Sequence, residues 1–333
     1  MQMISLKWLN MLAMTVLTPW SVQSQTPMIA NGQVQLVQAQ EAIFHDFVVP
    51  KSDSFNLLIL EAEGGDGGWI EYTYIDRFNT PRMQRVSAGE GATVSANYRI
   101  GTGFNEIPPG TILRVIAGNR GQWAKYDLLP NGDYGAGGGG GTAILMSRDN
   151  GNKWELLLVA GGGGGAGVHK NENEIKYYPG LPGTSNENGV GGGQLREMAE
   201  GGSRGDGGQS NQQTGGGGGA FTDGQHQNGI LNYGNAGWKD HSLSKQPLGG
   251  LGGIQDDLHN GGWGFGGGGS GAIGGGGGGG YSGGGAGMPG YGGGGGGSFI
   301  NTNTAHPLNS SKQQNSDTNN PGDGYVRYLF TKQ

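Results

Sequence analysis

Hydrophobic residues concentrate in two parts of the chain, and in both parts their pattern predicts β-strands. The larger part extends from Ala42 to Ala160 and the smaller from Tyr325 to Phe330. The larger part consists of short runs rich in β-branched and aromatic residues, bounded by Gly, Pro, Asn or Asp, as strands typically are. The predicted strands lie within AIFHDFVVP (42–50), SFNLLILEAEG (54–64), GWIEYTYID (68–76), ATVSANYRI (92–100), GTILRVIAG (110–118), GTAILMSR (141–148) and KWELLLVAGG (153–162).

Strands at this spacing, with turn signals between them, predict an antiparallel sandwich. The clearest turn signal is Asn150–Gly151 in MSRDNGNKW, because an Asn-Gly pair between two strand patterns favours a primed hairpin turn. The tail YVRYLF alternates, so Val326, Tyr328 and Phe330 should face the core beside LLILEA or ELLLVA. The chain ends of this domain are therefore expected to meet in one sheet. Only GGQLREMAEGG suggests a helix, and it is too short to be stable alone.

A long glycine-rich stretch, from about Gly161 to Asn320, separates the predicted strands from the tail. Glycine accounts for 78 of the 333 residues, against about 7% in ordinary proteins, and its runs alternate with polar loops. The runs have no fixed period, which excludes a solenoid of identical repeats, and they lack the Gly-X-Y periodicity of collagen. The stretch is either a flexible linker or an ordered insertion. Nearly pure glycine runs, followed by a strand that resumes after them, favour the ordered alternative.

An ordered polyglycine stretch can adopt polyproline-II geometry (polyglycine II), with three residues per turn and no internal hydrogen bonds. Every backbone N–H and C=O then points outward and needs a partner, so strands without side chains can pack together and bond one another. We expect these runs to lie side by side: Gly137–Gly141, Gly161–Gly165, Gly215–Gly219, Gly266–Gly269, Gly274–Gly280 and Gly292–Gly297. The central glycines that represent this bundle are Gly139, Gly163, Gly217, Gly268, Gly277 and Gly295. The aromatic residues expected to clamp its rim are Trp263, Phe265, Tyr281, Tyr291 and Phe299.

The first residues are typical of a secretory signal peptide. A single charge, Lys7, precedes the short apolar stretch WLNMLAMTVLTPW, and Val22 and Ser24 suit the −3 and −1 positions of a cleavage after Ser24. The alternative is a short N-terminal anchor that is retained; no later stretch is apolar enough to span a bilayer. The predicted organisation is a signal peptide (1–24), a β-sandwich section (25–160), a glycine-rich insertion with polar loops (161–320) and a returning strand (321–333). The protein is expected to be secreted or located at the cell surface.

Charge and cysteine content narrow the possible partners. The chain has 20 basic and 26 acidic residues, a formal net charge of −6, and loss of Lys7 with the leader makes it −7. Because there is no basic block, nucleic acid is not an expected partner. The chain contains no cysteine, so disulfides and thiolate metal sites are excluded.

Three motifs in order give the chain a family resemblance: LLLVAGGGGGAG, GGWGFGGGGSGAIGGGGGGGYSGG and GGGGGGSFI…GDGYVRYLF. Together they resemble the glycine-rich extracellular domain of the anaplastic lymphoma kinase and leukocyte tyrosine kinase receptors, and the strands before them resemble the tumour-necrosis-factor-like (TNF-like) sandwich fused to it. The resemblance covers about Ala42 to Phe330. It implies an all-β fold: a TNF-like, jelly-roll antiparallel sandwich with an inserted bundle of polyglycine-II helices, which in the receptors binds small protein ligands.

The chain also departs from that family. The receptors carry cysteine near the position of Ser270 to Ile273, and this chain has none. Motifs of the kinase, HRD and DFG, do not occur, and no glycine run is followed by Lys-Ser or Lys-Thr as in a P-loop. The chain is therefore expected to be a stand-alone exported copy without kinase activity.

The rest of the sequence contains only weak signals for metal binding, cell adhesion or catalysis. The six histidines, at positions 45, 169, 226, 241, 259 and 306, are scattered without metal-ligand spacing and are expected to be solvated. The Asp- and Asn-rich stretches DNGN and GGSRGDGGQSN lack the spacing of known calcium loops, so no cofactor is expected beyond an optional structural calcium. The tripeptide RGD, residues 204–206, is attributed to chance. The carboxylates Glu61, Glu63 and Asp66 are expected at a solvated strand end rather than in a catalytic pair.

These observations predict a non-enzymatic exported protein with a binding or structural role, such as an adhesin or matrix component. Its specificity should lie in polar loops carried by the glycine bundle, with residues 168–188, 221–246 and 301–320 as candidate surfaces for a protein or glycan ligand. Two alternatives remain: a receptor-like ectodomain for a protein ligand, and a carbohydrate-active enzyme with a glycine-rich appendage.

Overall fold

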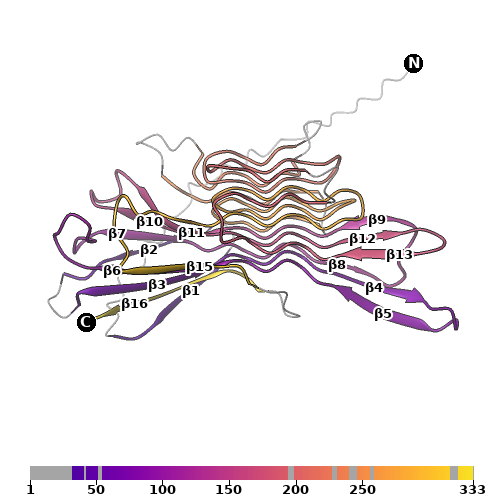
Figure 1. Ribbon diagram of the computed structural model, residues 1–333, viewed down its shortest axis with the longest axis horizontal. Helices are drawn as coiled ribbons and strands as arrows, with labels where there is room; N and C mark the ends of the chain where they lie inside the picture. Colours follow the sequence, from indigo (N-terminus) through magenta and orange to yellow (C-terminus); the bar gives the residue numbers. More distant parts are fainter. Residues whose placement is uncertain are drawn as a thin grey trace, which may run out of the picture.

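The protein is all-β in the part of the chain that the computed structural model describes. This part comprises residues 32–40, 43–51, 55–193, 199–226, 231–239, 246–255, 259–315 and 322–332, and it contains strands but no helices. Consequently no described helix could cross a membrane. The predicted leader and residues 194–198 of the candidate helix GGQLREMAEGG lie outside the described residues. The molecule is elongated, with β-sheets at its two ends and glycine-rich segments running side by side between them (Figure 1).

One end is a sandwich of two five-stranded antiparallel sheets, which confirms the predicted sandwich. The first sheet has the order β1 (Gln35–Gln38), β16 (Tyr325–Thr331), β3 (Leu57–Glu63), β6 (Thr93–Arg99) and β15 (Asn309–Gln313). The second has the order β14 (Phe299–Ile300), β11 (Glu155–Ala160), β10 (Thr142–Ser147), β7 (Ile112–Ile116) and β2 (His45–Val48). Each of the seven hydrophobic runs that predict strands contains one strand of the structure.

The tail closes the sandwich as predicted. Strand β16 pairs with β3 along its whole length, and its Val326, Tyr328 and Phe330 are buried in the core between the sheets. The Tyr328 ring stacks on Phe47 of the opposite sheet, with ring centroids 4.1 Å apart. The two ends of the described chain therefore meet in one sheet, where β1 also pairs with β16.

The hairpin between β10 and β11 has the predicted primed geometry. Asn150 and Gly151 have φ values of 61° and 86°, the left-handed conformation that Asn and Gly tolerate best. Asp149 Oδ1 completes this turn by accepting a hydrogen bond from the Lys153 N–H at 2.7 Å.

The other end of the molecule consists of two three-stranded sheets that the sequence predicts only in part. One has the order β5 (Pro81–Val86), β4 (Ile70–Ile75) and β8 (Ala124–Tyr126), and the other β13 (Ile175–Tyr178), β12 (Gly167–Lys170) and β9 (Gly132–Gly135). A small core unites them, including Ile70, Tyr72 and Val168, which are almost completely buried.

Glycine-rich segments join the strands of the two ends without a turn. Strand β3 continues through residues 64–68 towards β4, and β11 continues through residues 161–166 into β12. The same holds for the segments 87–92, 117–123 and 136–141, which join β5 to β6, β7 to β8 and β9 to β10. The chain therefore passes repeatedly from one end of the molecule to the other, and these passages form the middle layer in Figure 1.

The spatial division consequently differs from the predicted boundaries at 161 and 320. The section 25–160 contributes four segments to the glycine bundle, and the section 161–320 contributes four strands, β12 to β15. Strand β15 pairs with β6 inside the sandwich, so Ser310 is in an edge strand and not in a polar loop. Strands and bundle segments alternate along the chain because glycine at the end of a strand allows the chain to continue straight between closely spaced neighbours. A boundary drawn on the sequence does not reveal this alternation.

Hydrogen bonds in the bundle repeat every three residues. In segment 161–166 the N–H groups of Gly162 and Gly165 donate to Gly279 and Gly276 at 2.7 and 2.9 Å, so residues three apart face the same neighbour. Counting N–H and C=O groups, this segment bonds to six neighbours: 65–68, 89–92, 136–139, Leu181, 276–279 and 293–296. The backbone polar groups at the centre of the bundle are therefore paired with other passages of the chain.

Candidate binding site

The six glycines chosen to represent the bundle lie in closely packed segments. A Cβ at Gly277 would be 2.1 Å from the carbonyl oxygen of Gly284, and one at Gly163 would be 1.9 Å from that of Gly89. The corresponding distances at Gly139, Gly217, Gly268 and Gly295 are 2.1, 2.1, 2.0 and 2.0 Å. None of these six residues has a left-handed φ. Glycine is required here for space and not for an unusual backbone conformation.

Hydrogen bonds connect the predicted glycine runs to one another. Gly139 donates to Gly163 at 2.8 Å, and Gly277 donates to Gly215 at 3.1 Å. The runs 266–269 and 292–297 are joined to this group through the N–H of Gly138, which donates to Gly269, and that of Gly296, which donates to Gly162. The structure therefore brings all six runs into one bundle.

Four of the five predicted rim aromatics gather at the sandwich end of the bundle. Trp263 and Phe265 are buried against the outer face of the β14-β11-β10-β7-β2 sheet, and Tyr281 and Phe299 pack beside them. The rings of Tyr281 and Phe299 stack with centroids 4.3 Å apart. Tyr291 lies apart from these four, with its ring centroid 4.0 Å from that of Tyr178 in β13.

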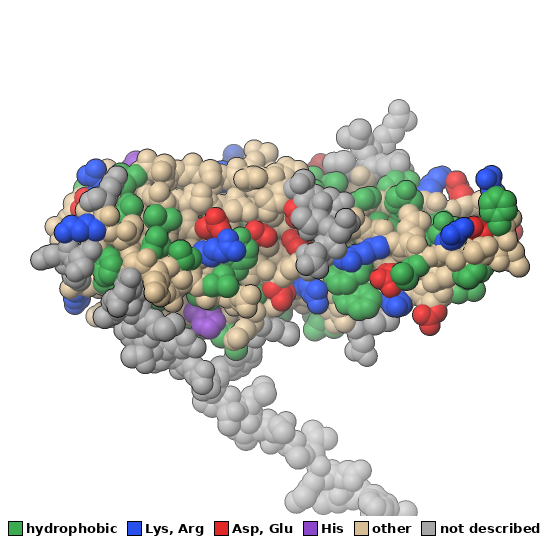
Figure 2. Space-filling view, turned by 90° about the horizontal axis from the view of Figure 1, so that it is seen from below, with side chains coloured by type: hydrophobic (Ala, Val, Ile, Leu, Met, Phe, Trp, Pro, Cys, Tyr) green, Lys and Arg blue, Asp and Glu red, His purple; other side chains and the backbone are tan. Residues whose placement is uncertain are grey.

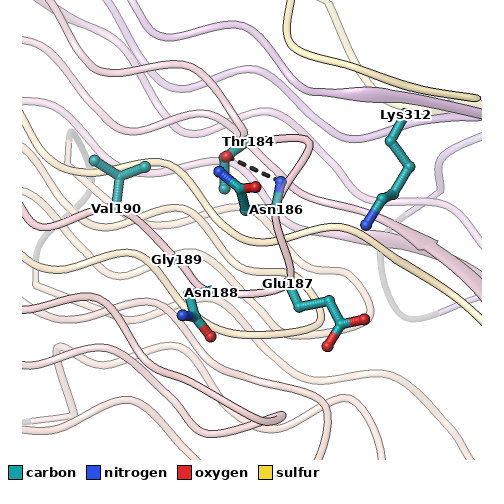
Figure 3. A pocket seen from close by; sticks show the side chains of 7 residues that line it. All are labelled: Thr184, Asn186, Glu187, Asn188, Gly189, Val190 and Lys312. Carbon is teal, nitrogen blue, oxygen red and sulfur yellow. Dashed lines mark hydrogen bonds between the residues drawn. The ribbon is translucent and has the colours of Figure 1, made fainter.

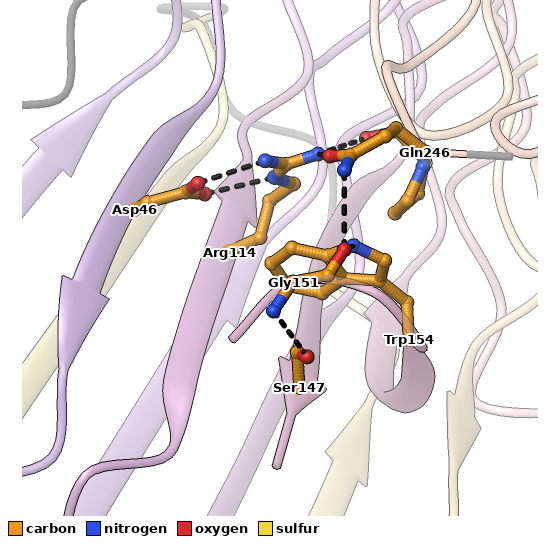
Figure 4. A network of polar contacts seen from close by, with 7 residues as sticks. Asp46, Arg114, Ser147, Gly151, Trp154 and Gln246 are labelled. Carbon is orange, nitrogen blue, oxygen red and sulfur yellow. Dashed lines mark hydrogen bonds and ion pairs between the residues drawn. The ribbon is translucent and has the colours of Figure 1, made fainter. Parts of the chain in front are cut away.

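A buried arginine that the sequence analysis missed fixes a loop to the same aromatic cluster (Figure 4). Arg114 of β7 is 3% exposed. Its guanidinium donates two hydrogen bonds of 2.8 Å to Asp46, and it lies 3.8 and 4.2 Å from the ring centroids of Phe44 and Trp154. It also donates to Gln246 Oε1 at 2.8 Å. The sequence signal for this network is a charged residue inside the apolar run ILRVI. The network holds residue 246 against the sandwich.

The expectation that Asp66 lies at a solvated strand end is wrong. Its side chain is buried and its carboxylate accepts hydrogen bonds from the backbone N–H groups of Gly91 at 2.7 Å and Gly322 at 2.6 Å. Burial raises the pKa of Asp66 to about 7, against the lowering effect of these hydrogen bonds. Burial also raises the pKa of Glu63. Asp66 therefore connects two bundle segments to the start of the returning strand, and we assign it a structural role.

An open polar pocket of about 630 Å³ lies where the bundle meets the sandwich (Figure 3). It is lined by Thr184, Asn186, Glu187, Asn188, Gly189, Val190 and Lys312. Most of the lining comes from one short loop, and Lys312 comes from edge strand β15 of the sandwich. The pocket thus combines parts of two predicted surfaces, 168–188 and 301–320.

The bundle fixes both ends of the pocket loop. The N–H of Thr184 donates to Gly296 at 2.9 Å, and the N–H of Val190 donates to Gly295 at 2.9 Å. Within the loop, the Thr184 hydroxyl oxygen accepts the Asn186 N–H at 3.1 Å. Because these anchors are backbone groups of the bundle, the loop has a fixed base from which the amide side chains of Asn186 and Asn188 extend.

The lining offers hydrogen-bonding groups of every type. Asn186 and Asn188 supply amide donors and acceptors, Glu187 supplies a carboxylate, and Lys312 supplies an ammonium group on the opposite side (Figure 3). The size lies within the range of small-molecule sites, although the walls are more polar than usual. Such a lining suits a hydroxyl-rich or zwitterionic group better than an apolar one.

The third predicted surface, 221–246, is described only in part and contributes to the aromatic end instead. Its Trp238 is buried in the cluster that contains Trp263 and Phe265, and Phe221 packs against it. Residues 227–230 and 240–245, which include His241, lie outside the described residues.

The other candidates of the sequence analysis have local partners. Asp206 of the RGD tripeptide accepts a hydrogen bond from the Thr222 hydroxyl at 3.3 Å. His169 is not simply solvated, because its Nδ1 lies 2.7 Å from the Asp133 carboxylate. In the described part of the chain, no three His, Asp or Glu side chains are grouped so that they could hold a metal ion.

No protein-family model matches the chain, and no curated protein is significantly similar to it.

Proposed function

We propose that this protein is an exported, non-enzymatic binding or structural protein that presents polar loops on a rigid bundle of polyglycine-II helices. The observation that carries the proposal is the three-residue repeat of hydrogen bonds, by which segment 161–166 bonds to six neighbours. Three residues per turn and outward-pointing backbone groups are the properties of polyglycine II. Segment 274–280 supports the assignment, since Gly276 and Gly279 both donate to the segment that contains Gly139.

A scaffold of this kind has side chains that could contact a ligand only at its edges. Its interior is backbone, so recognition must come from side chains of the flanking loops and sheets. The pocket around Asn186 and Lys312 is the best candidate, because its loop is anchored on the bundle at both ends. Its lining contains no histidine and no hydroxyl paired with a base, which supports binding over nucleophilic catalysis. A TNF-like jelly roll for the sandwich, and export by the predicted leader, belong to the same proposal.

The proposal is tested by binding of the purified protein to an array of glycans and immobilised proteins. We expect at least one ligand whose affinity falls about tenfold, the effect of about 1.4 kcal/mol, in Asn186→Ala, Asn188→Ala and Lys312→Gln variants. The matched controls are Asn105→Ala and Lys332→Gln, at exposed positions outside the pocket, and they should bind like the original protein. Ligands that are bound equally by all variants would exclude the pocket, and turnover of an arrayed glycan would favour the enzyme alternative.

A further inference from the structure

A pair of stacked tryptophans lies on the outer side of the sheet β5-β4-β8. Neither tryptophan lines the polar pocket. Trp69 and Trp123 come immediately before β4 and β8, whose parallel register pairs Ile70 with Ala124. The two indoles are therefore neighbours across the sheet, with ring centroids 5.1 Å apart and planes 2° apart. Trp123 remains 36% exposed, which is unusual for so large an apolar side chain.

Arginine side chains extend this stack. The guanidinium of Arg85 in β5 lies 4.3 Å from the Trp69 ring centroid, and that of Arg120 lies 5.3 Å from it. Strands β5 and β8 flank β4 on opposite sides, so Arg85 and Trp123 approach Trp69 from opposite neighbours of β4. Within the described residues neither guanidinium has an ion-pair partner. Asp323 accepts the backbone N–H of Arg120 at 2.9 Å.

This sheet is basic although the chain as a whole is acidic. Residues 69–86 and 119–126 contain five basic and two acidic side chains, whereas the whole chain has a net charge of −6. Two of the basic residues are ion-paired: Lys125 with Glu71 at 3.2 Å and Arg82 with Asp76 at 3.0 Å. Hydrophobic and charged side chains of both signs lie next to each other on the right half of the lower face, the end that carries β4 and β5 (Figure 2).

Indoles and guanidinium groups recognise complementary parts of a charged sugar. A flat aromatic ring packs against the C–H groups of a pyranose, and a guanidinium held flat against an aromatic ring keeps its N–H groups free for bidentate hydrogen bonds to a carboxylate or sulfate. Because Trp123 and Arg85 already pack on Trp69, the exposed indole of Trp123 is the one that can pack against a sugar ring. Nucleic acid fits less well, because the chain as a whole has a net charge of −6. We propose that the surface formed by Trp69, Trp123, Arg85 and Arg120 binds an anionic polysaccharide, carboxylated or sulfated.

The proposal is independent of the pocket and can be tested separately from it. Binding of the full chain to dextran sulfate and to polygalacturonate, with uncharged dextran as reference, can be measured by isothermal titration calorimetry at several salt concentrations. We expect binding to the two charged polymers that weakens as salt screens the charges, and none to dextran. The double variant Arg85→Gln/Arg120→Gln should weaken binding at least tenfold, and Trp123→Ala about fivefold.

Matched controls separate this surface from general charge and folding effects. Arg327→Gln removes one exposed charge at the sandwich end, and Phe104→Ala removes an aromatic side chain that is 93% exposed; neither should change affinity more than twofold. Thermal unfolding should show that all variants are folded. Unchanged binding by the double variant, equal binding of uncharged dextran, or tighter binding of single-stranded oligothymidine than of either polysaccharide would overturn the proposal. The pocket variants Asn186→Ala and Lys312→Gln should bind these polymers like the original protein.

Discussion

At the scale of single residues, the bundle depends on the absence of side chains. Most proteins use glycine where φ is positive, but the glycines of 274–280 are not in the left-handed region. An added Cβ at any of these seven positions would lie between 1.9 and 2.7 Å from a backbone atom of another segment. The packed neighbours are themselves bonded on several sides, so they cannot move away singly.

This close packing predicts a large effect of the smallest side chain. Gly277→Ala should lower the free energy of unfolding by several kcal/mol, on the order of 3 or more, because the methyl group would overlap the carbonyl of Gly284. Gly322→Ala is the matched control, since nothing lies within 4 Å of a Cβ there, and it should change stability by less than about 0.5 kcal/mol. Chemical denaturation measures both. Equal stability of the two variants would mean that residues 274–280 are a loose linker.

Asp66 makes stability depend on pH. Its pKa is about 7 in the folded protein, raised chiefly by burial from the ordinary value of 3.8. The folded state therefore binds the proton more tightly than the unfolded state, and the stabilisation present at low pH is lost as the pH rises from about 4 to about 7. We expect the unfolding free energy to fall between pH 4 and pH 7.

Replacement of Asp66 by asparagine isolates this contribution. Asp66→Asn removes the titrating proton, so the decline between pH 4 and pH 7 should be smaller in the variant. Its absolute stability can fall, because Gly91 and Gly322 donate to different carboxylate oxygens and the amide replaces one of these oxygens with an NH2 donor. The slope against pH, measured by urea denaturation, is the relevant quantity, and parallel curves for the two proteins would refute a raised pKa at Asp66.

At the scale of elements, the last strand holds the sandwich together. Strand β16 lies between β1 and β3 and buries Val326, Tyr328 and Phe330. A chain that ends at residue 321 would expose the edge of β3 and one side of the core, and such edges promote aggregation. We expect the truncated protein to aggregate or to unfold at a much lower temperature in thermal denaturation. A soluble fragment with unchanged cooperative unfolding would show that β16 is dispensable.

The burial and apolar content of each strand explain whether the sequence predicts it. Strands β3, β7, β10 and β11 are buried and consist of continuous or alternating apolar residues, so their pattern is visible. Strand β15, with the sequence NSSKQ, is exposed at a sheet edge, and its pairing with β6 depends on tertiary contacts that no local pattern encodes. The polar pocket was predictable only as two separate loops, because Lys312 and Asn186 are brought together by the fold.

At the scale of the whole molecule, the glycine bundle acts as the connection between two sets of sheets. Passages such as 64–68 and 161–166 are continuous with strands at both ends, so the position of one end is tied to that of the other through many parallel connections. The number of glycine runs indicated a bundle, but their order in it depends on contacts between distant segments. The stacked Trp69 and Trp123, which are 54 residues apart in the sequence, escaped prediction for the same reason.

Hydrogen exchange of glycine amides tests the central claim most directly. In protein labelled with ¹⁵N-glycine, the amides of Gly162–Gly165 and Gly276–Gly279 should exchange only through global unfolding, because each donates to a carbonyl of another segment. Gly32, an exposed residue before β1, provides a less protected reference. Slow exchange of the bundle amides, with protection equal to that of the sandwich core, is the result the account predicts. Exchange of these amides at the rate of an unstructured peptide would contradict it.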